Sequence, residues 1–202
     1  MLNIENPIGC RYSYSNFGYG VLGTALENAE KRSLADLFNE RILRPLGMKN
    51  SSLVMNEKIK ARLATAYRKD DPNVKTQAWR MGALSAAGNM FSTANDMGLF
   101  MINMLKTTNI NTIQQTSYLR VNNTWSYGLG CFPISSKARN TTLIHHGGDL
   151  DGFASYLILY PEYNAGFVIL TNSGVRGFGD FAEGINEIVF NEIVKKSKHV
   201  KK

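Results

Sequence analysis

Residues 143–172 have the sequence LIHHGGDLDGFASYLILYPEYNAGFVILTN, which carries the two strongest strand signals in the chain. Phe153–Tyr160 is rich in aromatic and branched residues, and Gly166–Thr171 is an unbroken apolar run. The connection between them has turn chemistry at Pro161 and Asn164. Two such runs around a short polar connection predict an antiparallel hairpin.

A shorter strand at Leu143–Ile144 leads into this hairpin and is predicted to end at the sequence HHGG, residues 145–148. Glycines at a strand end let a ligand or another backbone approach closely, because no β-carbon is in the way. An imidazole at such an edge, beside free backbone N–H groups, suits an oxyanion or a peptide-like carbonyl. The alternative is that the glycine pair is only a turn and the histidine only a solvated side chain.

Upstream of this stretch the chain is predicted to be mostly helical. A helix is expected over Phe17–Glu30, with Asn16 as a candidate N-cap. Gly18, Gly20 and Gly23 each weaken that helix by up to ~1 kcal/mol relative to alanine. Three such costs in one helix indicate that another element packs very close to it.

Two further helices are expected before the strands. One opens with a capping-box-like start at Ser33 and stops at the proline and glycine of residues 44–47. Residues 49–81 are polar and are predicted to form a long surface connection. Another helix begins near Thr93, and its apolar stripe is expected to be core. The members of that stripe are Met97, Phe100, Met101, Met104 and Leu105.

The last part of the chain contains a strand broken by glycines at 125–132 and an amphipathic helix at about 177–195. This layout predicts an α+β fold in which helices pack on an antiparallel sheet. We expect one domain with a mainly helical part at about 10–115 and a sheet part with its final helix at about 120–195. Residues 196–202 are expected to be a solvated basic tail.

Composition bounds the function further. The chain has 202 residues, 44% of them hydrophobic and 19% charged, which is ordinary for a globular protein with a real core. Much of the net charge of +7 comes from the C-terminal end, and no nucleic-acid-binding motif is visible. No signal peptide is visible, and no run approaches the ~18 apolar residues of a membrane span. The lysines of that end are Lys195, Lys196, Lys198, Lys201 and Lys202.

Cys10 and Cys131 are the only cysteines, too few for a cysteine-based metal site, and we expect neither a metal nor a cofactor. A single disulfide between them stays open, although two buried thiols are the simpler expectation. A remote alternative is a cysteine hydrolase that pairs Cys10 with His145 or His146. Nothing around Cys10 resembles the signature of such an enzyme.

Five segments, taken in order, resemble one family. They are YSNFGYGVLG from Tyr14, RPLGMKNSSL from Arg44, GALSAAGNMFSTANDM from Gly82, YGLGCF from Tyr127 and HHGGDLDGFASYLILYP from His145. Together they resemble the serine β-lactamase and DD-peptidase family, which includes class C β-lactamases, penicillin-binding-protein relatives and serine esterases. The resemblance runs from about Pro7 to about Val194 and implies a β-lactamase/transpeptidase-like fold.

One motif of that family is missing. Its nucleophile lies in Ser-x-x-Lys at the start of a helix, and no serine among the 202 residues has a lysine three positions later. The family places this motif upstream of Tyr-x-Asn, and only 13 residues precede Tyr14. The resemblance therefore implies an incomplete domain, without the nucleophile, its helix and the first strands.

The resemblance assigns roles to residues of the two motifs that are present. Tyr14 would relay the proton of the serine and the leaving group, and Asn16 would donate its amide to the substrate carbonyl. His146 replaces the lysine of the more common Lys-Thr-Gly motif and would face Tyr14 across the cleft, polarising it or binding a substrate carboxylate. Gly147–Gly148 would admit the substrate, and the backbone N–H of Asp149 would be one oxyanion donor.

Two functions follow from this pattern. The first is a serine hydrolase of β-lactamase, D-alanyl-D-alanine carboxypeptidase or esterase type, present as a fragment that is inactive alone and acts on a small acyl substrate when complete. The second is a non-catalytic ligand- or partner-binding module derived from that family. His145 is expected to be structural. The substrate and the compartment stay open, although the family is often periplasmic or extracellular.

The resemblance also implies a partner for the strand at 166–171. In the resembled fold this strand is central, with Phe153–Tyr160 on one side and the first strand of the family's fold on the other. Its sequence is apolar on both faces and has no lysine, proline or bulge signal that would protect an edge. We therefore expect self-association or a partner strand at this position.

Overall fold

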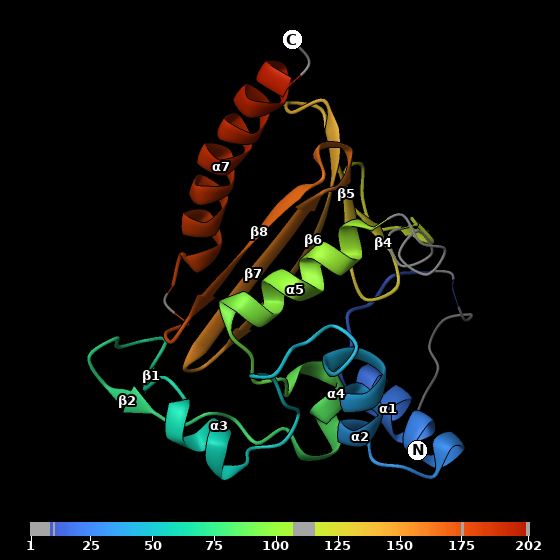
Figure 1. The fold of residues 1–202 in the computed structure, drawn as a ribbon, viewed down its shortest axis with the longest axis vertical. Coiled ribbons are helices and arrows are strands. Elements are labelled where there is room, and N and C mark those ends of the chain that lie inside the picture. Colours follow the sequence, from blue (N-terminus) through green and yellow to red (C-terminus); the bar gives the residue numbers. More distant parts are fainter. Residues whose placement is uncertain (1–8, 10, 107–115, 175, 201–202) are drawn as a thin grey trace.

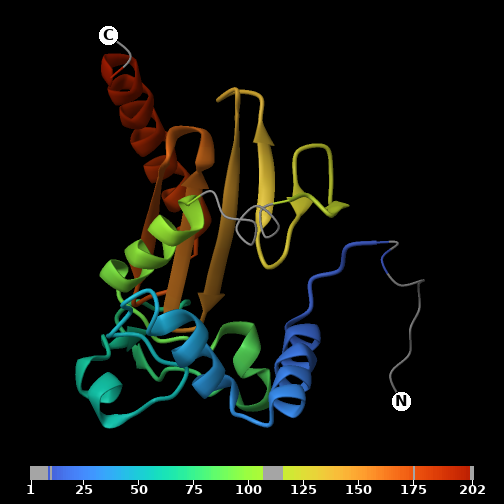
Figure 2. The same cartoon turned by 45° about the vertical axis from the view of Figure 1, so that its right-hand side comes forward.

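The computed structural model describes residues 9, 11–106, 116–174 and 176–200 (Figures 1 and 2). Its helices are α1 (Asn16–Glu30), α2 (Leu34–Phe38), the π-helix η1 (Asn39–Leu43), α3 (Glu57–Arg62), the 3₁₀ turn η2 (Gly82–Leu84), α4 (Ser85–Gly88), α5 (Ala94–Leu105), the 3₁₀ turn η3 (Pro161–Tyr163) and α7 (Phe178–Val200). Its strands are β1 (Ala66–Tyr67), β2 (Lys75–Thr76), β3 (Leu119–Arg120), β4 (Ser126–Tyr127), β5 (Phe132–Ser136), β6 (Thr141–Leu150), β7 (Phe153–Tyr160) and β8 (Ala165–Thr171).

The main sheet has the order β5-β6-β7-β8, and each neighbouring pair is antiparallel. The predicted hairpin is confirmed, because β7 and β8 pair from Ala154 with Thr171 to Tyr160 with Ala165. The turn uses the chemistry expected from sequence. Proline opens η3, and Asn164 ends it in the left-handed region at φ 47°.

Helices cover both faces of this sheet, as Figure 1 shows for α5 in front and α7 beside β8. On one face, Met101 and Met104 of α5 pack against Ile144, Leu159 and Cys131. On the other face, the residues of α7 pack against β6, β7 and β8. Those contacts form two clusters, one with Phe190, Leu143, Ile158 and Tyr160, and one with Phe178, Ala182 and Ala154. The α+β class and the β-lactamase/transpeptidase-like fold are therefore confirmed, with a helix on each face.

A second layer of short helices lies below one end of the sheet (Figures 1 and 2). Within it α1 packs against η2 and α4, and the β1–β2 hairpin stands at its edge.

The helix starts follow their sequence signals. The side chains of Ser33, Asn56 and Thr93 each accept a hydrogen bond from the backbone N–H three residues later, which satisfies a free donor of the first turn. Residues 49–81, which were predicted to be a long surface connection, contain helix α3 and the β1–β2 hairpin and are therefore more regular than expected.

Strand β6 differs from its prediction. The sequence places a strand end at residues 145–148, whereas β6 continues through both glycines to Leu150. The chain turns only at Asp151–Gly152, where Gly152 has φ +103°. The reason is β7, which pairs with β6 from Ile144 to Leu150 and holds the glycines extended. The glycine pair is therefore part of a strand and not a turn.

Two helix ends also differ from their predictions. Ser15, and not Asn16, is the N-cap of α1, because its backbone is extended and its hydroxyl accepts the N–H of Gly18 at 2.9 Å. At the other end, α7 continues to Val200, so most of the predicted basic tail is helical. No proline or glycine interrupts it there, and Lys195 pairs with Glu192 one turn earlier at 2.6 Å.

The glycines of α1 have the close neighbour that the sequence predicts. A β-carbon on Gly23 would lie 2.6 Å from the β-carbon of Ala86, and one on Gly20 would lie 3.0 Å from the carbonyl oxygen of Ala83. Gly18 meets only the side chain of Ser15, in its own cap. Two of the three glycines therefore let α1 approach η2 and α4.

Replacing Gly23 with alanine is expected to destabilise the protein by about 1–3 kcal/mol, because the added methyl group overlaps Ala86. The matched control is Gly98→Ala in α5, where a β-carbon would meet nothing within 4 Å and alanine should stabilise by up to ~1 kcal/mol. Adding Ala86→Gly to Gly23→Ala should restore part of the loss. Urea denaturation measures all three, and equal stability of the two single variants would contradict the packing argument.

Candidate active site

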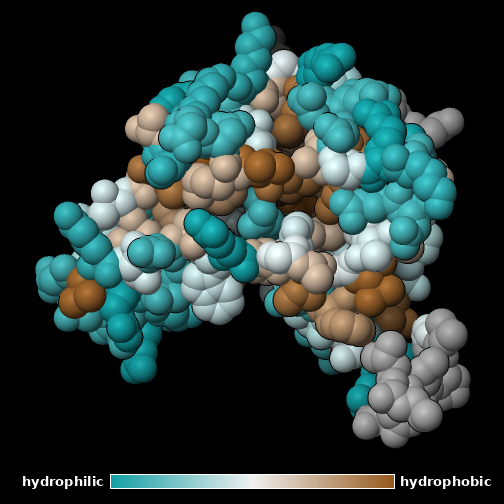
Figure 3. Space-filling view, turned by 90° about the horizontal axis from the view of Figure 1, so that it is seen from below, coloured by the Kyte–Doolittle hydropathy of each residue, from teal (hydrophilic) through white to brown (hydrophobic). Residues whose placement is uncertain are grey.

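An open cavity of about 1000 Å³ lies between the sheet and the helical layer. It appears in Figure 3 as a hollow between two lobes, bordered by apolar surface. The cavity is lined by all six residues that the sequence singled out. They are Tyr14, Asn16, His146, Gly147, Gly148 and Asp149. The structure thus brings two motifs that are far apart in sequence to one cavity, and the chemical roles of these residues remain predictions.

Tyr14 and Asn16 enter the cavity from the start of α1. Ser15 caps this helix, so Asn16 is its first residue and Tyr14 lies just before it, 59% exposed. The preceding segment is held by Tyr12, whose ring lies 5.1 Å from that of Tyr127 and 5.8 Å from that of Phe132. This aromatic anchor ties the Tyr-x-Asn motif to β4 and β5.

His146 is oriented by one hydrogen bond and one ring contact. Its Nδ1 lies 2.5 Å from the carbonyl oxygen of Gly130, and its ring is 5.7 Å from that of Phe132. A carbonyl oxygen can only accept, so Nδ1 must carry the proton and donate it. In the neutral ring Nε2 is then an acceptor, available to a phenol or a ligand.

The backbone of β6 is open beside His146. Strand β5 pairs with β6 only as far as His145, so from His146 to Leu150 β6 pairs with β7 alone among the described strands. An unpaired strand edge presents backbone N–H groups, which are the donors that an oxyanion site uses. Gly148 lets the hydroxyl of Ser155 lie close to the backbone of β6, because a β-carbon at this position would be only 3.0 Å from that hydroxyl.

Asp149 is tied to the β1–β2 hairpin. Its carboxylate forms an ion pair with Lys69, and the N–H of Lys69 donates to the carboxylate of Asp151 at 2.8 Å. This pairing holds the hairpin next to the β6–β7 turn. Ala78 and Trp79, which follow the hairpin in the chain, also line the cavity. Sequence reasoning missed Lys69 and Trp79, which belong to no motif, and it treated Ser155 only as part of the strand that follows the glycine pair.

His145 lies apart from the cavity, as expected for a structural residue. Its ring packs 4.7 Å from Tyr156 and 5.8 Å from Trp125, and neither of its nitrogens has a hydrogen-bond partner in the part of the chain that the structure describes. Burial lowers the pKa of His145 to about 4; the charge of His146 acts in the same direction, and Glu183 opposes both. The imidazole is therefore neutral at physiological pH.

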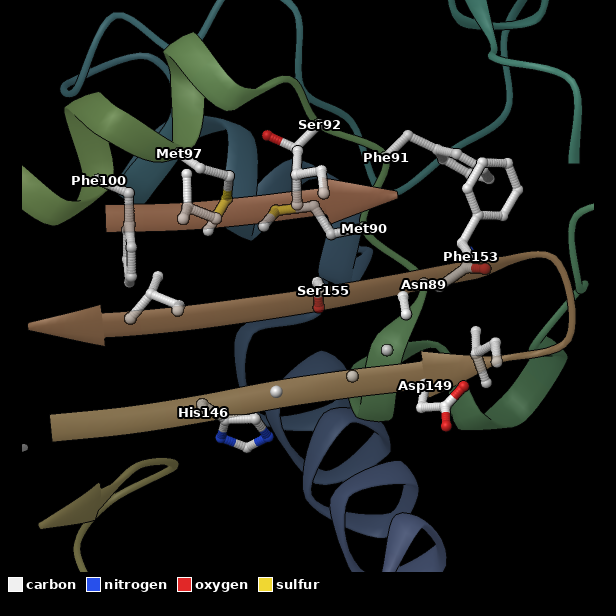
Figure 4. A pocket seen from close by; sticks show the side chains of 18 of the residues that line it. Asn89, Met90, Phe91, Ser92, Met97, Phe100, His146, Asp149, Phe153 and Ser155 are labelled. Carbon is white, nitrogen blue, oxygen red and sulfur yellow. The ribbon is translucent and has the colours of Figure 1, made fainter. Parts of the chain in front are cut away.

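The far end of the cavity is apolar. Figure 4 shows His146 and Asp149 extending from β6 and Met97 and Phe100 from α5, with Ser155 of β7 between them. The apolar stripe of α5, which was predicted to be core, therefore has two environments. Met101 is buried in the core, whereas Met97 and Phe100 line the cavity. Cys131 is buried in the same region, and burial raises the pKa of its thiol to about 11. Cys10, its candidate disulfide partner, lies outside the described residues.

Within residues 9, 11–106, 116–174 and 176–200, no three His, Cys, Asp or Glu side chains are grouped so that they could hold a metal ion. None of the helices in this same part of the chain is both long and apolar enough to cross a membrane.

Sequence comparison assigns most of the chain to a known group of proteins. The beta-lactamase family model matches residues 2–188. The chain is 29% identical over 199 residues to the D-alanyl-D-alanine-carboxypeptidase/endopeptidase AmpH of Escherichia coli K12, covering 90% of this chain and 50% of AmpH. It is 25% identical over 196 residues to Protein flp of Staphylococcus aureus MRSA252, covering 93% of this chain and 38% of flp. The chain thus spans half or less of the length of these relatives.

Solved structures share the fold. A beta-lactamase/D-alanine carboxypeptidase from Yersinia pestis, complexed with citrate, superposes with a TM-score of 0.79 at 24% identity, covering 94% of this chain and 57% of that one. A class C beta-lactamase superposes with a TM-score of 0.74 at 19% identity, covering 86% of this chain and 55% of that one. At these identities the likeness concerns the fold alone.

Proposed function

Because this chain belongs to the beta-lactamase family, we propose that it supplies one half of a serine acyl-transfer site, the half that carries Tyr-x-Asn and His-Gly-Gly. The enzyme would be a serine hydrolase of D-alanyl-D-alanine carboxypeptidase, β-lactamase or esterase type. The observation that carries this proposal is the convergence of Tyr14, Asn16 and His146 on one cavity, although the two motifs lie far apart in the sequence. The DD-carboxypeptidase name of the AmpH relative supports the same reaction class.

In this proposal each residue acts on a small acyl substrate. The phenol of Tyr14 relays the proton between the serine and the leaving group, and His146 Nε2 accepts from that phenol or meets the substrate's acidic group. Asn16 donates its amide to the substrate carbonyl. The open backbone of β6 at Asp149 donates to the oxyanion that forms as the carbonyl becomes tetrahedral.

A second candidate function rests on a specific observation. None of the 202 residues forms a Ser-x-x-Lys motif, so the chain by itself has no nucleophile of the family's kind. On its own it would be a module that binds a ligand or a partner without reacting. Self-association or a partner strand at residues 166–171 belongs to this candidate.

The first test is intact-mass measurement of the purified chain after incubation with a penicillin. We expect an unchanged mass, because an acyl-enzyme needs a nucleophilic serine activated by a base. A stoichiometric adduct on any serine would sink the assignment of the nucleophile to a segment outside these residues.

The second test joins the chain to a family segment that carries Ser-x-x-Lys and measures the rate of adduct formation. We expect acylation, slowed by Tyr14→Phe, which removes only the phenolic hydroxyl. Tyr118→Phe is the matched control, since Tyr118 is 55% exposed and does not line the cavity. A folded hybrid that acylates equally well with and without the Tyr14 hydroxyl would refute the role of this residue.

A further inference from the structure

The turn between β4 and β5 holds a glycine in a conformation that other residues rarely adopt. Gly130 has φ +79°, in the left-handed region. The N–H of Gly128 donates to the carbonyl oxygen of Cys131 at 2.8 Å and closes the turn around Leu129 and Gly130. The carbonyl oxygen of Gly130 lies 2.5 Å from Nδ1 of His146. The direction of one peptide group therefore decides which ring nitrogen of His146 carries the proton.

This hydrogen bond lies where the ladder between β5 and β6 ends. The last ladder pair joins Phe132 to His145, so the carbonyl of Gly130 lies just beyond the ladder and meets a side chain instead of a backbone N–H. In a free neutral imidazole the proton prefers Nε2, and a hydrogen bond from Nδ1 to a carbonyl oxygen reverses that preference. The reversed tautomer leaves Nε2 of His146 as an acceptor beside the cavity.

A pair of tyrosines connects the same turn to α1. The hydroxyls of Tyr19 in α1 and Tyr127 in β4 are hydrogen-bonded to each other. Burial raises the pKa of Tyr127 and the hydrogen bond with Tyr19 adds to this, whereas a hydrogen bond from the backbone of Gly130 opposes both. A backbone bond that lowers the pKa of a phenol is one in which an N–H donates to the phenol oxygen. The N–H of Gly130 therefore meets Tyr127, while its carbonyl meets His146.

We propose that three positioning residues, Tyr19, Tyr127 and Gly130, fix the tautomer of the site histidine. They hold His146 with its proton on Nδ1 and tie this state to the position of α1. Neither tyrosine lines the cavity, so both act through other groups and not by touching a substrate. The inference rests on the proposed function for the chemical use of Nε2, whereas the tautomer itself does not depend on that function.

Nitrogen-15 NMR of the histidine rings measures the tautomer, because the protonated and unprotonated nitrogens of a neutral ring have widely separated shifts. Spectra are recorded at about pH 9, where histidine is neutral, and His146→Gln assigns the signals. We expect the Nδ1–H form of His146 in the parent chain. Gly130→Ala strains a φ of +79° and should convert the ring mainly to the Nε2–H form. The matched control is Gly47→Ala, which introduces similar strain at φ +71° outside the cavity lining and should leave His146 unchanged.

Two hydroxyl deletions test the connection to α1. Tyr127→Phe and Tyr19→Phe each remove one hydroxyl and keep the ring, so the aromatic packing is retained. We expect both to raise the share of the Nε2–H form of His146, and Tyr127→Phe to raise it more, because its hydroxyl meets the turn directly. Tyr118→Phe is the control, since Tyr118 is 55% exposed and lies outside the cavity lining.

The spectra decide the proposal. A parent chain with the proton of His146 on Nε2 overturns it, and so does a Gly130→Ala variant that keeps the Nδ1–H form and a native circular dichroism spectrum. Deletions of the Tyr19 and Tyr127 hydroxyls that change His146 no more than Tyr118→Phe does overturn the connection to α1.

The hybrid that carries Ser-x-x-Lys tests the chemical use of this tautomer. There Gly130→Ala should slow acylation at least about tenfold relative to Gly47→Ala, since a catalytic histidine held in the wrong tautomer loses much of its activity. Equal acylation of the two variants, with the tautomer of His146 changed in the first, overturns that use. A hybrid that does not acylate at all counts against the proposed function, whereas the spectra still decide the tautomer.

Discussion

Replacing Phe190 with alanine is expected to lower the free energy of unfolding by about 3–5 kcal/mol, a large share of the roughly 5–15 kcal/mol of a typical domain. Phe190 is 7% exposed and belongs to the cluster that joins α7 to the sheet. Its ring lies 4.9 Å from Tyr160 and 5.6 Å from Tyr163, and the Arg139 guanidinium lies 5.8 Å away over its face. Truncation leaves a cavity that these large rings cannot collapse to fill.

The matched control is Ile188→Ala in the same helix. Ile188 is 63% exposed, so its replacement should change stability by no more than about 0.5 kcal/mol. Urea denaturation followed by circular dichroism compares the two variants. Similar midpoints would mean that α7 does not pack on the sheet through Phe190.

Acid is expected to destabilise the protein through His145. In the unfolded chain an imidazole titrates near 6.5, whereas burial lowers the pKa of His145 to about 4 in the folded state. Between about pH 6.5 and pH 4 the imidazole of His145 binds a proton in the unfolded chain but stays neutral in the folded protein. Stability from this group is therefore complete above about pH 6.5 and is lost as pH falls to about 4. The loss amounts to about 3 kcal/mol, at 1.36 kcal/mol for each unit of pKa difference.

The variant His145→Phe isolates this effect, because it keeps an aromatic ring beside Trp125 and Tyr156 but cannot take up a proton. Glu183 also loses stabilising interactions in acid, since its pKa is lowered by hydrogen bonds from Arg139, Asn186 and Tyr156 against the effect of burial. The informative quantity is thus the difference between wild type and variant in unfolding free energy at pH 7 and pH 4. A difference that is constant with pH would show that the pKa of His145 is not shifted in the folded state.

Much of this fold was accessible from sequence because its signals are local. The β7–β8 hairpin follows from two apolar runs around Pro161 and Asn164, and α5 follows from Thr93 and an apolar stripe. The close approach of α1 to its neighbour was visible as glycines that a helix would otherwise avoid. The six site positions came from the family resemblance and not from periodicity; they are Tyr14, Asn16, His146, Gly147, Gly148 and Asp149.

What the sequence could not supply depends on contacts between distant segments. The extension of β6 to Leu150 requires β7 beside it, since two glycines have no strand preference of their own. The ion pair of Lys69 with Asp149 joins positions 80 apart, in a stretch predicted as a plain connection. The environment of His145 likewise depends on Trp125 and Tyr156, which come from two other elements.

The contact between the hydroxyls of Tyr19 and Tyr127 spans 108 positions of sequence and links α1 to β4 beside the candidate site. Closing so long a loop carries a chain-entropy cost that local helices and the hairpin do not have. Contacts of this range slow folding and form after local ones. Tyr14 and His146 therefore face the same cavity only after the helical layer docks on the sheet, so a refolding experiment should recover helix and hairpin signals before any ligand binding.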